Sequence, residues 1–259
     1  MKSENKKLLL LSDLYFRLFG IPEITQTILF RAVSKLLDIN HQHIILDVGC
    51  GYGLFSCWLA SQGAQVLGLD IAKGKVEFAK STARNLDIED KVSYVIASAT
   101  CLPIKEKSFN ASLCLDVIEH IPNDVDALSE ISRVLKPKGF LILTTPCLIE
   151  KYHSSAHNRF GSAWGHVRDG YSFKALNKIC KETCLEILRL QYWLKFFATK
   201  VSDFYYNFFW ERHSKTRLAL CAMLFPFMYA IAFIDEIFLR KSKGNEFIIE
   251  AIKFNNCKV

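Results

Sequence analysis

The sequence predicts an α/β fold built on a mostly parallel sheet. Between Ile44 and Thr145, short apolar runs alternate with longer segments of helical periodicity, which is typical of successive β-α-β units. The first apolar run is followed by three glycines at alternate positions, Gly49, Gly51 and Gly53, and then directly by a helical pattern. Glycines let the backbone approach a ligand closely, and the start of a helix attracts polar groups. We therefore expect a ligand site at this turn.

Five strands are expected within this region, each a short apolar run bounded by glycine, proline or polar residues. They span residues 44–48, 65–70, 92–97, 111–116 and 140–145. A helix is predicted over 73–85, and another after Pro122 with Asn123 as its N-cap. The motif Lys136-Pro137-Lys138-Gly139 is expected to stop that second helix.

An acidic residue ends the second predicted strand. Asp70 follows the run 66–69 and is placed to accept hydrogen bonds from the hydroxyls of a ribose. The dinucleotide fingerprint Gly-x-Gly-x-x-Gly would need a glycine where this chain has Leu54. This mismatch disfavours the hypothesis that the chain is a nicotinamide-dependent oxidoreductase.

Composition limits the other function classes. The chain has 259 residues, of which 51% are hydrophobic, so it can bury a full core. Its net charge is +7, but no block of five or six like charges occurs, so a nucleic-acid partner is not expected. Most of the nine cysteines lie in apolar runs and are expected to be free thiols in a reducing, cytoplasmic compartment. The apolar run Leu8–Leu11 is too short for a secretory signal and predicts a helix.

From Asp47 to Pro146 the chain resembles the class I S-adenosylmethionine-dependent methyltransferases. The loop Asp47-x-Gly49-x-Gly51-x-Gly53 resembles their first motif, and segments 97–110, 115–121 and 135–141 resemble later motifs in the same order. The resemblance points to the small-molecule and lipid branch that includes the ubiquinone-biosynthesis enzymes. It implies a doubly wound, seven-stranded, mostly parallel sheet. It also implies S-adenosylmethionine as cofactor and methyl transfer to an O, N or C atom of a small-molecule or lipid-like acceptor.

The resemblance assigns the cofactor to the glycine loop and to the ends of the second, third and fourth strands. The implied contacts are Asp47, Gly49, Cys50, Gly51, Gly53, Asp70, Ile71, Ser98, Ala99, Thr100 and Asp116. Ser98 departs from the family, whose aspartate at this position accepts a hydrogen bond from the adenine amino group. A serine hydroxyl accepts that bond without charge assistance. A catalytically silent protein that binds or assembles with a partner is therefore kept as an alternative.

Candidate catalytic side chains follow the fourth and fifth strands: Glu119, His120, His157 and His166. Histidine is the side chain best suited to take a proton near neutral pH. The segment 165–172 resembles a signature found in a subset of the family, in which His166 and Arg168 either contact the substrate or brace the loop. Asp116, Glu119 and His120 have ligand types that suit a divalent ion, but no metal is expected.

The chain is divided into a helical N-terminal cap (1–43), a catalytic core (44–193), an apolar helical insertion (194–244) and a final core strand (245–259). The insertion is rich in phenylalanine, and residues 218–234 carry no charge. The family fold pairs strands near 186–192 and 247–254, so a single membrane crossing between them would break the sheet. We expect two helices meeting at Pro226, or one helix lying flat. Such a segment would cover the substrate or make a peripheral membrane contact through residues 194–243.

Overall fold

The computed structural model describes residues 24–37, 39, 41–148, 165–205, 215–238 and 243–254. In these residues the strands form one seven-stranded sheet in the order β3-β2-β1-β4-β5-β7-β6. Strand β7 runs antiparallel to β5 and β6, and the other pairs are parallel. The predicted doubly wound, mostly parallel sheet is confirmed. The strands are β1 Ile44–Val48, β2 Gln65–Asp70, β3 Val92–Ile96, β4 Phe109–Leu115, β5 Leu135–Pro146, β6 Leu185–Trp193 and β7 Glu246–Lys253.

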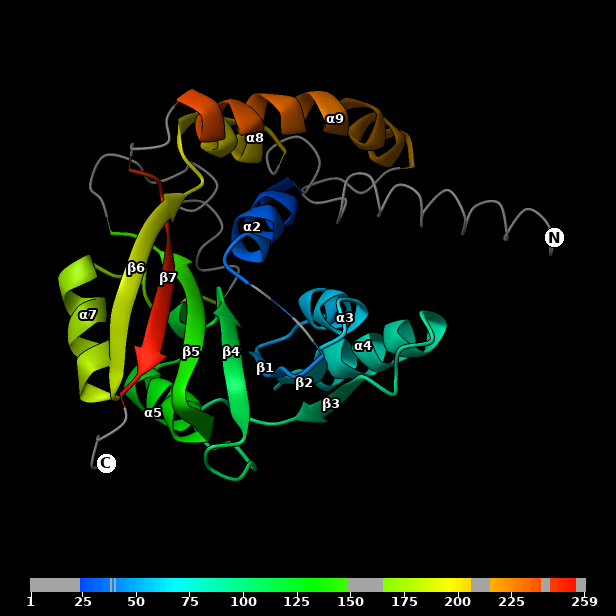
Figure 1. The fold of residues 1–259 in the computed structure, drawn as a ribbon. Coiled ribbons are helices and arrows are strands. Elements are labelled where there is room, and N and C mark those ends of the chain that lie inside the picture. The colour runs from blue at the N-terminus through cyan, green and yellow to red at the C-terminus, as the bar shows by residue number, and fades with distance from the viewer. Residues whose placement is uncertain are drawn as a thin grey trace.

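Helices cover both faces of the sheet (Figure 1). One buried cluster joins α2, α3 and α4 to the sheet, and another joins α5 and α7 to its opposite face. Neighbouring residues of a strand point to opposite faces, so Ile45 belongs to the first cluster and Leu46 to the second. The helices are α2 Ile24–Ser34, α3 Leu54–Ser61, α4 Lys73–Asn85, α5 Asp124–Val134, α7 Phe173–Glu182, α8 Phe196–Tyr205 and α9 Lys215–Phe238, with the 3₁₀ helix η1 Ile118–His120.

The sheet reverses its strand order beside β1. This strand pairs in parallel with β2 on one side and with β4 on the other. In open α/β sheets, ligands bind beyond the carboxyl ends of the strands at such a reversal. The glycine turn after β1 lies at this edge, so the topology places the predicted site residues together.

Two local expectations differ from the structure. Strand β5 begins at Leu135, five residues earlier than predicted, because Leu135 pairs with Phe109 ahead of a register shift in β4. Asn123 occupies the N-cap position of α5, but its side chain makes no capping hydrogen bond. Ser172, by contrast, caps α7 by accepting a hydrogen bond from the Ala175 backbone N–H at 3.2 Å.

The insertion forms two helices, α8 and α9, that pack on α2 above the carboxyl edge of the sheet (Figure 1). The expectation that two helices meet at Pro226 is wrong, because α9 runs through that residue from Lys215 to Phe238. Buried Phe225 and Met228 on either side of the proline pack toward α8, and this packing holds the helix together. Among the described residues, no helix combines the length and apolar character needed to cross a membrane.

The first predicted N-terminal helical segment and His157 lie outside the described residues. Cys50, Cys57, Cys101, Cys114, Cys147 and Cys180 are free thiols. Cys184 is disulfide-bonded, which differs from the expectation for a chain of free thiols in a reducing compartment.

Candidate active site

A pocket of about 480 Å³ opens at the carboxyl ends of β1, β2 and β4. Its size falls within the roughly 300–1,000 Å³ that is usual for small-ligand sites. Most of the residues predicted to bind the cofactor line it. The lining consists of Gly49, Leu69, Asp70, Ile71, Lys75, Ala97, Ser98, Ala99, Thr100, Asp116, Val117, His120, Ile121, Pro122 and Asn123.

The glycine turn after β1 needs its glycines for two different reasons. All three have left-handed backbone angles, with φ of +68° at Gly49, +54° at Gly51 and +77° at Gly53. A Cβ atom at Gly49 would lie 2.4 Å from a methyl carbon of Val117, and one at Gly53 would lie 2.6 Å from the Tyr94 hydroxyl. A Cβ at Gly51 would meet no atom within 4 Å. Gly51 therefore leaves open space, as a ligand passing close to the backbone would require.

Asp70 is fixed in place at the end of β2. Its Oδ2 accepts a hydrogen bond from the Gly51 N–H at 2.9 Å, and its Oδ1 accepts one from the Ala72 N–H at 2.8 Å. The side chain is buried but still lines the pocket. Each carboxylate oxygen can accept more than one hydrogen bond. Asp70 therefore holds the glycine turn and keeps acceptor capacity for the two hydroxyls of a ribose.

Asp47 and Cys50 lie behind the pocket and are not part of its lining. Asp47 Oδ2 accepts a hydrogen bond from the Ser56 hydroxyl at 2.5 Å, and burial raises the pKa of Asp47 to about 6. The Cys50 N–H donates to the Leu69 carbonyl at 2.9 Å, and burial raises the pKa of its thiol. These contacts join β1 to α3 and β2 and fix the shape of the turn.

Ser98 stands where the resemblance implies an aspartate, and the hydroxyl of Thr100 lies beside it. Ser98 Oγ accepts a hydrogen bond from the Thr100 N–H at 3.3 Å, and the Ser98 and Thr100 hydroxyls are 2.9 Å apart. Both residues line the pocket. Neutral hydroxyls can accept a bond from an amino group, although more weakly than a carboxylate.

Asp116 follows β4 in an unusual backbone conformation, with φ of +53°. The Thr144 hydroxyl accepts a hydrogen bond from the Asp116 N–H at 2.9 Å and donates one to Asp116 Oδ1 at 2.6 Å. Burial raises the pKa of Asp116 to about 6, against a smaller lowering by Thr144. Left-handed backbone at a non-glycine residue is costly and is often found at functional sites, where the surroundings hold it in place.

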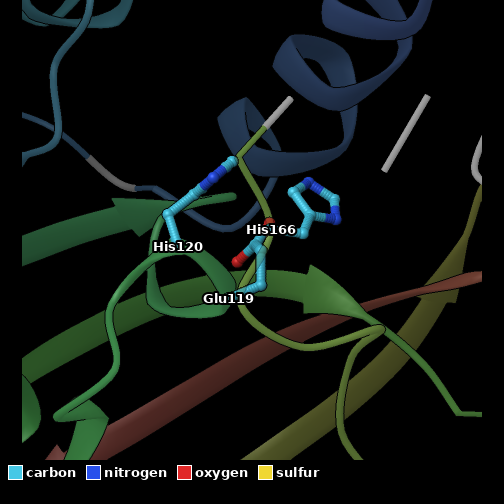
Figure 2. Close-up of side chains that lie close together, drawn as sticks. All are labelled: Glu119, His120 and His166. Atoms are coloured by element: carbon cyan, nitrogen blue, oxygen red, sulfur yellow. The ribbon is translucent and has the colours of Figure 1, made fainter. Parts of the chain in front are cut away.

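Glu119, His120 and His166 converge beside this pocket, and their side chains are directed toward one another (Figure 2). One ligand atom from each lies within 4.8 Å of the others, and the two imidazole rings are 4.6 Å apart, edge to face. Glu119 is buried and accepts a hydrogen bond from the Thr145 hydroxyl at 3.2 Å. Burial and the neighbouring Asp116 raise the pKa of Glu119, whereas burial lowers the pKa of His120. These shifts favour the neutral form of the Glu119 carboxyl and the neutral form of the His120 imidazole, which can accept a proton.

Arg168 braces the segment that carries His166. Its guanidinium forms an ion pair with Asp124 and donates to the Pro122 carbonyl at 2.9 Å. The Tyr171 hydroxyl donates to Asp124 Oδ2 at 2.6 Å. These bonds join the segment before α7 to the loop before α5, so Arg168 has the bracing role. His166 is brought against Glu119 by this arrangement, and its own role stays a prediction.

The sequence reading missed several residues. Lys75 lines the pocket, and Thr144 and Thr145 hold the two acids. Glu246 begins β7, and its Oε2 is buried without a hydrogen-bond partner among the described residues. Burial, and then the charges of Asp116 and Glu119, raise its pKa. Glu246 is far from these acids in sequence, so only the β5–β7 pairing reveals it.

Residues 46–143 match a family model described as a methyltransferase domain. The chain is 36% identical over 108 residues to Methyltransferase GfsG of Streptomyces halstedii, covering 41% of this chain and 39% of that protein. It is 37% identical over 114 residues to a ubiquinone biosynthesis O-methyltransferase of Xanthomonas oryzae pv. oryzae, covering 44% and 46%. These matches therefore span less than half the length of either relative.

The whole fold is similar to that of a solved geranyl diphosphate methyltransferase in complex with SAM. The TM-score is 0.61, with 16% sequence identity, and the match covers 86% of this chain and 84% of that one. At this level of identity the likeness concerns the fold. The family-model match, by contrast, runs from within β1 to within β5 and includes the glycine turn, Asp70 and Asp116.

Proposed function

We propose that this chain, a class I S-adenosylmethionine-dependent methyltransferase by its core motifs and fold, transfers a methyl group from that cofactor to a small-molecule or lipid-like acceptor. The observation that carries the proposal is the pocket at the ends of β1, β2 and β4. There Asp70 is fixed with acceptor capacity left, and Gly51 leaves open space beside it.

The residues present fit the cofactor. Asp70 would accept hydrogen bonds from the ribose hydroxyls, and Ser98 with Thr100 would receive the adenine amino group. Asp116, which also lines the pocket, would hold the amino group of the amino-acid end through its carboxylate. When bound, the cofactor supplies an activated methyl group on sulfur. The chain's task is to exclude water and to hold the acceptor atom in line with that methyl group.

The group at Glu119, His120 and His166 would serve the acceptor side. The imidazoles of His120 and His166 can accept the proton that a hydroxyl or amine acceptor releases, and Glu119 can orient them. Carboxylate and imidazole groups also suit a divalent ion, so the same side chains support a second, metal-assisted version of this site. Activity that survives dialysis against a chelator would favour the proton-transfer version.

The acceptor class follows from the resemblance and from the insertion. A lipid-like acceptor such as a quinone precursor would be met at a membrane surface. We therefore propose a cytoplasmic enzyme that works at the periphery of a membrane, with α8 and α9 covering the acceptor.

A methyl-transfer assay tests the proposal. Purified protein is incubated with cofactor labelled in its methyl group, together with total lipid and small-molecule extracts, and labelled products are separated. We expect a labelled product that depends on the protein. If the protein binds the cofactor but labels nothing in any extract, the catalytically silent alternative replaces this proposal.

A substitution separates acceptor chemistry from cofactor binding. His166→Ala should lower turnover about 100-fold, the lower range for loss of a general base, and leave the Kd of the cofactor nearly unchanged. His41→Ala, at an exposed residue before β1, is the matched control and should not change either value. Equal loss of turnover and cofactor affinity in His166→Ala would make His166 structural.

A further inference from the structure

Helix α9 is apolar on two opposite faces. Phe225, Met228 and Ala232 are buried on the side that packs toward α8 and α2. Met223 and Phe227 lie on the opposite side of the helix, where their side chains are 64% and 68% exposed. Ile231 and Phe238 lie on the same outer side and are 44% and 76% exposed. An amphipathic surface helix would place charged or polar residues on this outer side.

Helix α8 also presents apolar residues outward. Phe196 and Phe204 are 51% and 47% exposed, and exposed Lys200 lies between them at helical spacing. Its other side is buried through Ala198 and Val201. Asp235 of α9 joins the two helices, because its carboxylate accepts hydrogen bonds from the Phe197 N–H at 3.0 Å and the Ala198 N–H at 2.7 Å. The two helices are therefore packed together, and each has exposed apolar residues on its outer side.

Charge identifies the kind of partner. Residues 218–234 of α9 carry no charge, while Lys215 and Arg217 precede them, and Arg240, Lys241 and Lys243 follow. Lys215 and Arg217 begin α9 and Lys200 is exposed on α8, while the carboxylate of Asp235 near the other end of α9 is turned inward onto α8. Anionic lipid headgroups would complement Lys200, Lys215 and Arg217, while the acyl region would take the exposed phenylalanines.

We propose that the outer faces of α8 and α9 form a docking surface for an anionic lipid bilayer. The helices lie on the membrane surface and do not cross it. Seated in this way, α9 of 24 residues would lie along about 36 Å of the interface at 1.5 Å per residue. The docking needs no methyl transfer, so its failure and a failure of the proposed activity are distinguished by separate measurements.

Vesicle flotation tests the docking with the full chain. Vesicles are made of phosphatidylcholine alone or of phosphatidylcholine with phosphatidylglycerol. We expect the protein to float with the anionic vesicles and to remain largely unbound with the neutral ones. The double variant Met223→Glu with Phe227→Glu should lower the partition coefficient about tenfold or more, since it removes two apolar side chains from the interface. Lys200→Glu should reduce the preference for anionic vesicles.

Two controls keep the test specific. Leu188→Glu, at a residue of β6 that is 58% exposed, should bind vesicles as the unchanged chain does. Circular dichroism and cofactor titration must show that each variant is folded. Failure of the unchanged chain to float with anionic vesicles would overturn the proposal, as would undiminished flotation of the double variant. Conversion of a dimer to a monomer by the double variant in analytical ultracentrifugation would assign the surface to a second copy instead.

Discussion

Three acids meet at the edge of the sheet and carry much of the site's electrostatics. Asp116 is half-buried and Glu119 is buried, and they receive hydrogen bonds from Thr144 and Thr145. Glu246 has a buried oxygen with no such partner among the described residues. A buried carboxylate without hydrogen bonds is costly when ionised, and two neighbouring acids increase that cost. Glu246 therefore opposes folding at neutral pH.

Glu246→Gln should stabilise the protein in a pH-dependent way. Because the pKa of Glu246 is raised well above 4.5 in the folded state, the folded protein keeps a proton that the unfolded chain has released. The free energy of unfolding of the unchanged chain thus falls as pH rises from about 4.5 through the folded pKa, and the deficit persists above it. Glutamine stays neutral. In urea unfolding, the free energy of unfolding of Glu246→Gln should equal that of the unchanged chain at about pH 4. At about pH 8 it should be higher by roughly 1–3 kcal/mol.

Glu250→Gln is the matched control for this measurement. Glu250 lies on the same strand and forms an ion pair with Arg189 at 3.6 Å. Its loss should change the free energy of unfolding by less than about 1 kcal/mol. A gain for Glu246→Gln that is the same at all pH values would show that the ionisation of Glu246 is not perturbed by folding.

At the scale of elements, the local sequence pattern predicted the parallel strands well and the insertion poorly. Apolar runs bounded by glycine gave β1 and β2 with their observed ends, because buried parallel strands need continuous apolar residues. The proline rule placed a break at Pro226, where α9 continues. Packing of Phe225 and Met228 outweighs the lost hydrogen bond there, and no local pattern contains that tertiary contact.

Pro226→Ala should therefore stabilise the protein. The substitution restores a backbone donor for the carbonyl of residue 222 and removes the clash of the ring with the preceding turn. We expect a gain of roughly 1–2 kcal/mol in the free energy of unfolding. This is less than the full cost of a proline within a helix, because alanine also raises the conformational entropy of the unfolded chain. Ala230→Pro, at an exposed position of the same helix, should cost about 3 kcal/mol. A loss of stability in Pro226→Ala would mean that a proline kink shapes the packing of α9 on α8.

At the scale of the whole molecule, the sequence predicted the candidate residues that lie in or near a motif. The glycine turn, Asp70 and Asp116 belong to strand ends that follow one another in the chain, so a motif could identify them. Glu246 and the threonines of β5 reach the site through sheet pairing and carry no motif of their own. The residues that β5 and β7 contribute are therefore the part that needed the fold.

The central claim is that the pocket beside Asp70 and Gly51 binds S-adenosylmethionine. Calorimetric titration tests it directly, with a nicotinamide dinucleotide as the competing ligand. Asp70→Ala removes the acceptor for the ribose hydroxyls, and Gly51→Val places a side chain in the open space and strains a left-handed backbone position. Circular dichroism confirms that each variant is folded.

We expect S-adenosylmethionine to bind and the dinucleotide not to bind. Asp70→Ala should weaken the binding of S-adenosylmethionine by roughly 1–3 kcal/mol, and Gly51→Val should abolish it. Binding of the dinucleotide alone, or an unchanged Kd for S-adenosylmethionine in both variants, would contradict the central claim.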